Sequence, residues 1–118
     1  MSLIELMLTI QTQLKIYHWQ TKKYSEHKAF GQAYDSLDEL IDSFMEIYIG
    51  KFGNNSKDQL SLSLYSYNDN FKSQIKEFIK ILSVDITKIL SQHDTDLLNI
   101  RDEILGTLNQ LLYLLSLE

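Results

Sequence analysis

Two of the three histidines, His18 and His27, lie nine residues apart and precede two carboxylates, Asp42 and Glu46. The two carboxylates are four residues apart, so a helix places them on one face. Imidazole and carboxylate ligands together suit iron, zinc or manganese. These four residues therefore form a candidate transition-metal site. Two further acidic residues in the same stretch are candidate additional ligands: Asp35 and Asp38.

A structural interpretation of the same residues is also open. His18 and His27 would then be partly buried histidines, hydrogen-bonded beside a turn between two helices. The carboxylates lie nearly opposite the apolar residues of their helix, and acidic faces of this kind usually contact solvent. Within one bundle the acidic stripe would face water, so the metal interpretation requires a second subunit packed on that side.

The elements that must position these residues are predicted to be helices. Apolar residues recur at steps of three and four, the pattern of an antiparallel bundle, and the chain has no proline to interrupt it. Ser25 and Asp94 are predicted N-caps, and Gly50 and Gly53 are predicted to end the second helix. The predicted helices cover residues 2–22, 25–49, 69–91 and 94–117.

The connection over residues 50–68 determines the predicted topology. The other two connections are short, so they should join antiparallel neighbours. An extended segment of this length can span a helix of about 36 Å. Residues 1–118 are therefore predicted to form one all-α domain, a ferritin-like four-helix bundle with a long crossover between helices two and three. The alternative is an up-down bundle with a loose loop, and residues 60–64 would add a short strand-like piece in either case.

The bulk composition excludes several classes of function. The net charge is −5, with one arginine against ten lysines, which disfavours binding to DNA. The absence of cysteine excludes disulfides and thiolate ligands. The first residues are acidic rather than basic, and no apolar run has the length to span a membrane. We therefore expect a cytoplasmic protein without DNA or membrane partners.

Arg101 interrupts an apolar seam on the last predicted helix. A guanidinium group at such a position must be paired, because a lone buried charge is very costly. One interpretation is an ion pair that fixes helix register, which is the commoner use of such residues, and the other is an anion or ligand site at the end of the bundle. The predicted partners are carboxylates on neighbouring helices: Asp38, Asp42, Glu46 and Asp85.

The stretch over residues 14–50 resembles the metal-binding signature of the Dps mini-ferritins, on His18-Trp19, His27, Tyr34, Asp42 and Glu46. In that family the ferroxidase centre lies between two subunits, with histidines from one and an aspartate and a glutamate from the other. The resemblance implies a homodimer or higher homo-oligomer that binds iron. The chain differs in two respects: the spacing between the histidines is three residues shorter, and Gly31 stands where the family has an aspartate.

The whole chain also resembles a group of small uncharacterised proteins of bacteriophages and large DNA viruses, on residues 17–21, 27–30 and 99–103. This similarity implies a viral protein, either in the cytoplasm of an infected cell or associated with the virion. Two functions are open. One is a protein that binds or oxidises iron, or holds zinc or manganese. The other is a non-catalytic bundle without a cofactor, which engages a host protein, sequesters a small ligand or has a structural role in the virion.

Overall fold

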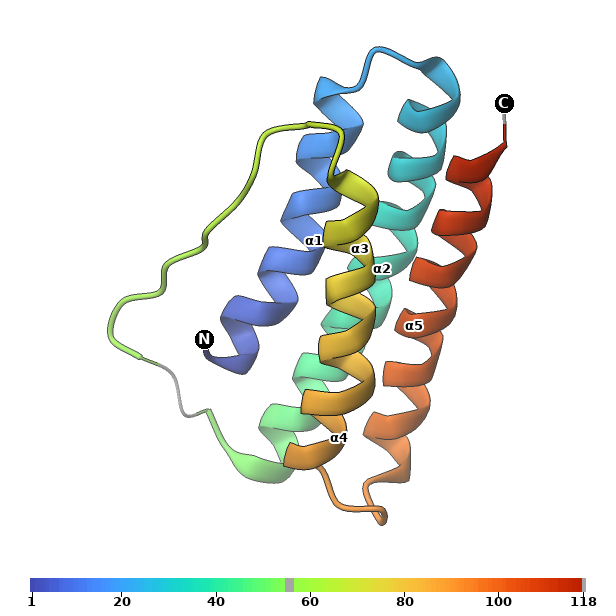
Figure 1. The fold of residues 1–118 in the computed structure, drawn as a ribbon. Helices are drawn as coiled ribbons and strands as arrows, with labels where there is room; N and C mark the ends of the chain where they lie inside the picture. Colours follow the sequence, from blue (N-terminus) through green and yellow to red (C-terminus); the bar gives the residue numbers. More distant parts are fainter. Residues whose placement is uncertain (55–56, 118) are drawn as a thin grey trace.

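The computed structural model describes residues 1–54 and 57–117, and within them the regular structure is entirely helical, as predicted. Residues 55 and 56 of the predicted crossover, and residue 118, lie outside this description. The described residues form four rods (Figure 1). The elements are α1 (Leu3–Gln20), α2 (Tyr24–Phe52), a third rod made of α3 (Phe71–Lys80), the π-helical segment η1 (Ile81–Asp85) and α4 (Ile86–Ile89), and finally α5 (Thr95–Ser116).

The path of the chain places the third rod parallel to α2. A tight turn reverses the chain between α1 and α2, and the segment after α2 returns along the bundle before α3 begins (Figure 1). Successive side chains of α1 bind the backbone of this returning segment: Glu5 contacts Ser61, Gln13 contacts Tyr65, and Gln20 contacts Tyr67. The crossover is therefore fastened along α1. Residues 60–64 are extended but form no strand with any other described residue.

The core is one cluster of apolar side chains to which every rod contributes. An aromatic cluster closes its upper end, directly below the turn between α1 and α2. Its ring centroids lie between 5.1 and 6.1 Å apart. Burial of these large rings fixes the turn that carries the two histidines. The members of the cluster are Tyr17, Phe30, Tyr67 and Phe71.

The helix ends differ in part from the predicted caps. Ser25 is not a cap, because α2 begins at Tyr24 with Lys23 at the N-cap position and no side-chain cap bond. Asp94 is the N-cap residue of α5, as predicted, but its carboxylate accepts from the Ser91 amide at 2.8 Å instead of capping the first turn. At its other end α2 continues through Gly50 and stops at Gly53, where φ is +89°.

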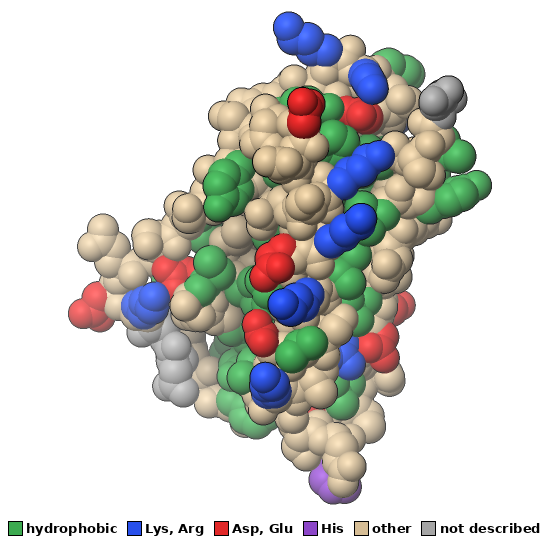
Figure 2. Space-filling view, viewed as in Figure 1, with side chains coloured by type: hydrophobic (Ala, Val, Ile, Leu, Met, Phe, Trp, Pro, Cys, Tyr) green, Lys and Arg blue, Asp and Glu red, His purple; other side chains and the backbone are tan. Residues whose placement is uncertain are grey.

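The lower end of the bundle is less covered than the upper end. By length, α1 extends about 27 Å and α2 about 43 Å, so α2 and α4 continue past the start of α1 (Figure 1). A groove of about 500 Å³ opens there, lined mainly by apolar residues. On the face shown in Figure 2, lysine and acidic side chains alternate over the third rod without forming a patch of one sign. None of the helices in the described residues is long and apolar enough to cross a membrane.

Candidate functional site

His18 and His27 face each other across the turn between α1 and α2. Their rings are stacked, with centroids 3.9 Å apart and planes inclined by 16°. His18 Nδ1 lies 2.7 Å from the carbonyl oxygen of His27, and His27 Nδ1 lies 2.9 Å from the carbonyl oxygen of His18. A carbonyl oxygen only accepts, so each Nδ1 must carry the proton. In the neutral form of such a ring the Nε2 lone pair is the one left for a metal ion.

The turn that holds the histidines is braced by a buried carboxylate. Oε1 of Glu26 accepts hydrogen bonds from the hydroxyls of Thr21 and Tyr67, both at 2.7 Å. Glu26 is buried despite its charge, and Tyr67 belongs to the crossover. Burial, and then the hydrogen bond to Glu26, raise the pKa of Tyr67. The crossover therefore locks the turn and, with it, the relative position of the two imidazoles.

Asp42 and Glu46 lie together at the other end of the acidic stripe. Both are exposed, and Asp42 raises the pKa of Glu46, first through a hydrogen bond between the carboxyl groups and then through charge repulsion. Asp35 and Asp38 are also exposed, and Asp38 accepts a hydrogen bond from Gln11 Nε2 at 2.7 Å. The predicted solvent-facing stripe is therefore present.

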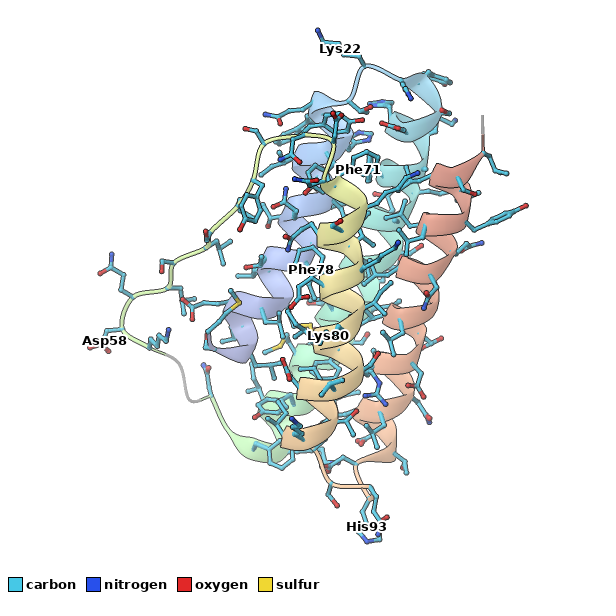
Figure 3. All side chains as sticks on the ribbon, in the orientation of Figure 1. Lys22, Asp58, Phe71, Phe78, Lys80 and His93 are labelled. Atoms are coloured by element: carbon cyan, nitrogen blue, oxygen red, sulfur yellow. The ribbon has the colours of Figure 1, made fainter. Side chains whose placement is uncertain are left out.

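The structure brings the predicted ligands together as two pairs and not as one set. His27 and Asp42 are fifteen residues apart on α2, a separation of about 22 Å along the axis. Within one chain, no three histidine, aspartate or glutamate side chains of the described residues gather around a common point. Figure 3 shows the third histidine, His93, at the opposite end of the bundle from Lys22 in the α1–α2 turn.

The histidines and the acidic stripe border one surface, which we call the α1–α2 face. We define it by Leu8, Lys15 and Trp19 on α1 and by positions 27, 31, 34, 38, 42, 45 and 49 on α2, which recur at steps of three and four. Trp19 is 68% exposed, and the neighbouring Tyr24 is 74% exposed. Neither is a core aromatic. Lys15 bridges the rings of Tyr34 and Trp19, with Nζ 4.4 and 5.6 Å from their centroids.

Apolar residues also flank the acidic stripe. Met45 and Ile49 are half-buried beside it, whereas Ala29 is buried in the core. Sequence reasoning missed Leu8 and Lys15. The one signal in the sequence concerns Leu8, which falls outside the apolar core spacing of α1.

Arg101 is nearly buried but does not bind the predicted carboxylates. Its Nη1 donates to the carbonyl oxygen of Leu82 at 3.1 Å and to the hydroxyl of Thr87 at 2.6 Å. Its ion pair, at 2.9 Å, is with the adjacent Asp102. The predicted partners Asp38, Asp42, Glu46 and Asp85 were wrong. The reason is local, because Leu82 lies within η1, where the widened turn disturbs the regular ladder of helical hydrogen bonds. Arg101 therefore binds the third rod where its helix is distorted.

Comparison with known proteins identifies the family. Residues 18–115 match the model of a family of unknown function, DUF5856, and the chain belongs to that family. The chain is also 30% identical over 113 residues to an "uncharacterized 14.6 kDa protein in mobD-ri intergenic region" of Enterobacteria phage T4. That alignment covers 96% of this chain and 84% of the phage protein. The expected similarity to bacteriophage proteins is confirmed. No solved structure matches the chain.

Proposed function

We propose that this chain is a ferritin-like protein that binds a divalent transition metal at a site shared by two antiparallel copies. Iron is the ion implied by the resemblance to the Dps mini-ferritins, and zinc or manganese suit the same donors. The observation that carries the proposal is the reciprocal bonding of His18 and His27. Both Nδ1 atoms are bound to carbonyl oxygens at 2.7 and 2.9 Å, which leaves the Nε2 atoms as the nitrogens that could bind a metal in the neutral rings. Bonds of this kind orient metal-ligating histidines.

The separation of the two pairs requires the second copy. A distance of about 22 Å excludes one ion shared by His27 and Asp42 of the same chain. The midpoint between these two residues lies near Tyr34. A two-fold axis at that level, with the α2 helices antiparallel, would bring His27 opposite Asp42 of the partner subunit. The same two-fold rotation places Asp42 opposite His27 of the partner subunit, as an isologous contact requires.

The charge on the α1–α2 face supports this arrangement. The end near the turn carries Lys15, Lys28 and the two histidines, and the other end carries Asp42 and Glu46. Antiparallel packing would place each basic end on an acidic one, which favours association and fixes register. It would also cover Leu8 and Trp19, which are 39% and 68% exposed. An exposed apolar surface beside complementary charges is typical of an interface.

The donor set fits a divalent cation. Two neutral imidazole nitrogens and two carboxylates form an N₂O₂ set of the kind that iron, zinc and manganese accept. Asp42 and Glu46 repel each other when both are ionised, and this repulsion contributes to the raised pKa of Glu46. A bound cation would relieve that repulsion. The ion would supply Lewis acidity or, for iron, redox chemistry, and the chain's own residues would orient it.

Calorimetric titration of the purified protein with ferrous iron, under exclusion of oxygen, and with zinc tests the proposal. We expect one ion per pair of donor clusters, and loss of binding in His27→Ala. His93→Ala is the matched control, because His93 is exposed at the other end of the bundle. Asp35→Ala should change the affinity little unless Asp35 replaces the aspartate that is missing at Gly31. Binding should weaken on acidification, because ligation requires neutral imidazole.

The result that would contradict the proposal is the absence of heat above background for both ions while the protein is folded and dimeric. A monomer at tens of micromolar in sedimentation would remove the shared site as well. We also expect no binding to duplex DNA, because the chain is acidic with a net charge of −5.

A non-catalytic binding module is the second candidate function. The specific observation that favours it is the apolar groove of about 500 Å³ at the lower end, whose lining includes Leu3, Tyr48 and Ile89. In this interpretation His18, His27 and the acidic residues form an interface network without metal. The two functions are distinguished by the titration above, since only the first predicts that His27→Ala removes measurable heat.

A further inference from the structure

Gly31 lies directly beneath the imidazole of His18. A Cβ atom built on Gly31 would stand 2.8 Å from His18 Cε1 and 3.0 Å from His18 Nδ1. Real Cβ atoms essentially never lie within 3.0 Å of another atom, so a side chain at position 31 would force the His18 ring to shift away from Cε1's present position. The ring is held there by its bond to the carbonyl oxygen of His27 and by stacking on the His27 ring.

The backbone conformation at position 31 does not require glycine. Gly31 lies in the interior of α2, and the only glycine with positive φ in the described residues is Gly53. Glycine in a helix interior destabilises the helix relative to alanine. Any benefit must therefore come from the space it leaves, and His18 fills that space.

We infer that Gly31 is the positioning residue for His18, because it leaves the space against α2 that the imidazole occupies. That Gly31 positions His18 is argued from the contact geometry alone. That this position serves metal binding rests on the proposed function. The positioning role also accounts for the difference from the Dps pattern, because an aspartate at position 31 would occupy the volume of the His18 ring. At this end of the α1–α2 face, Asp35 lines the same cavity as the two imidazoles, and Asp42 and Glu46 would come from the partner subunit.

The test compares Gly31→Ala with Gly106→Ala. Gly106 lies in the interior of α5, and a Cβ there meets nothing within 4 Å. Gly106→Ala should therefore raise the melting temperature by about 3–5 °C through helix propensity alone. Gly31→Ala should fail to give that gain, because the new methyl group must displace the His18 ring. In the background of His18→Ala the clash is gone, and the gain should return.

Long-range ¹H–¹⁵N spectra of the histidine rings provide the direct measurement. In the wild type, His18 should show a proton on Nδ1 that exchanges slowly, and in Gly31→Ala that signal should be lost or shifted while His93 is unchanged. Zinc affinity should fall at least about tenfold in Gly31→Ala, as is usual when the support of a ligating histidine is removed. Gly106→Ala should bind zinc as the wild type does.

Two outcomes separate this inference from the proposed function. If the wild type binds no zinc, the proposed function fails, yet the spectra and the double variant still report whether Gly31 holds His18. If Gly31→Ala raises the melting temperature as much as Gly106→Ala and leaves the His18 signal unchanged, the positioning role is wrong whatever the protein binds.

Discussion

The two sides of α1 that do not face the core differ sharply. The side towards the crossover carries buried polar residues, and all of them are bonded: Glu5 is 2% exposed and Gln13 is 1% exposed. The opposite side carries Leu8, Lys15 and Trp19, and the ring of Trp19 is largely exposed. One helix therefore buries polar groups on one side and exposes apolar ones on the other, the reverse of the usual preference.

The crossover explains the first side, because it covers α1 with backbone that needs hydrogen bonds. Gln13 meets this need twice, with Oε1 accepting from the Tyr65 amide at 2.9 Å and Nε2 donating to the Tyr65 carbonyl at 2.7 Å. No segment in the described part of the chain covers the side with Leu8, Lys15 and Trp19 in this way. Because an exposed apolar surface favours burial, we propose that a second copy of the chain covers that side.

The largest expected effect is on the covered side. Gln13→Ala should lower the free energy of unfolding by about 2 kcal/mol, because it leaves two backbone groups of Tyr65 without their partner and opens a gap under the crossover. Gln11→Ala is the matched control, with the same change on the same helix. Gln11 reaches only the exposed Asp38, so the loss should stay below about 0.5 kcal/mol. Urea denaturation measures both, and equal losses would remove the distinction between the two sides.

The next effect concerns the uncovered side. Trp19→Ala should weaken self-association about 10- to 30-fold, or about 1.4–2 kcal/mol, because large aromatic residues dominate interface energies. The stability of the monomer should hardly change, since the ring is 68% exposed. Tyr113→Ala on α5 is the control, because Tyr113 is similarly exposed, at 61%, but lies outside the α1–α2 face. Sedimentation equilibrium would decide, and equal dimer constants in both variants would mean that another face associates.

The sequence predicted the helices better than the contacts between them. Leu97, Ile104 and Leu108 follow the expected seam and are buried, because apolar periodicity depends only on neighbours along the helix. The path of the crossover was predicted from its length alone. Its attachment to Gln13 was not predicted, since a glutamine that binds a distant backbone leaves no periodic signal.

The candidate site shows the same division. The two histidines were singled out by type and spacing, but their reciprocal bonds and the space above Gly31 exist only after α1 and α2 pack. Arg101 was correctly identified as needing partners. Those partners, a backbone carbonyl and Thr87, depend on the π-helical segment η1, which has neither glycine nor proline to mark it.

A smaller effect is expected at Arg101, whose guanidinium group bonds a backbone carbonyl of the third rod. Arg101→Leu and Arg101→Ala both remove the donor to Leu82, but leucine keeps the packing between Leu97 and Ile104. Arg101→Leu should therefore be more stable than Arg101→Ala by about 1 kcal/mol, and both should be less stable than the wild type. Thermal unfolding measures the difference. If Arg101→Ala were as stable as the wild type, the contact with η1 would contribute nothing.

The last expected effect, on how the stability of the fold changes with pH, concerns Glu5. Lys57 Nζ at 2.7 Å, and then the amides of Ser61 and Ser2, hold the pKa of this carboxyl far below its ordinary value of 4.5. A depressed pKa means that the unfolded chain takes up a proton before the folded one does. Glu5 therefore stabilises the fold above about pH 4.5, and this contribution is lost as the pH falls further.

Glu5→Gln isolates this contribution, because glutamine keeps an oxygen that can accept from Ser61. At pH 7 the variant should be less stable than the wild type, because glutamine lacks the negative charge that Lys57 and the two amides stabilise. Between pH 4.5 and pH 3 its free energy of unfolding should fall less steeply than that of the wild type, by the slope of one proton. The control is Glu39→Gln on the exposed side of α2, which should leave the slope unchanged. Parallel curves for wild type and Glu5→Gln would mean that the crossover is held to α1 by Gln13 and Gln20 and not by charge.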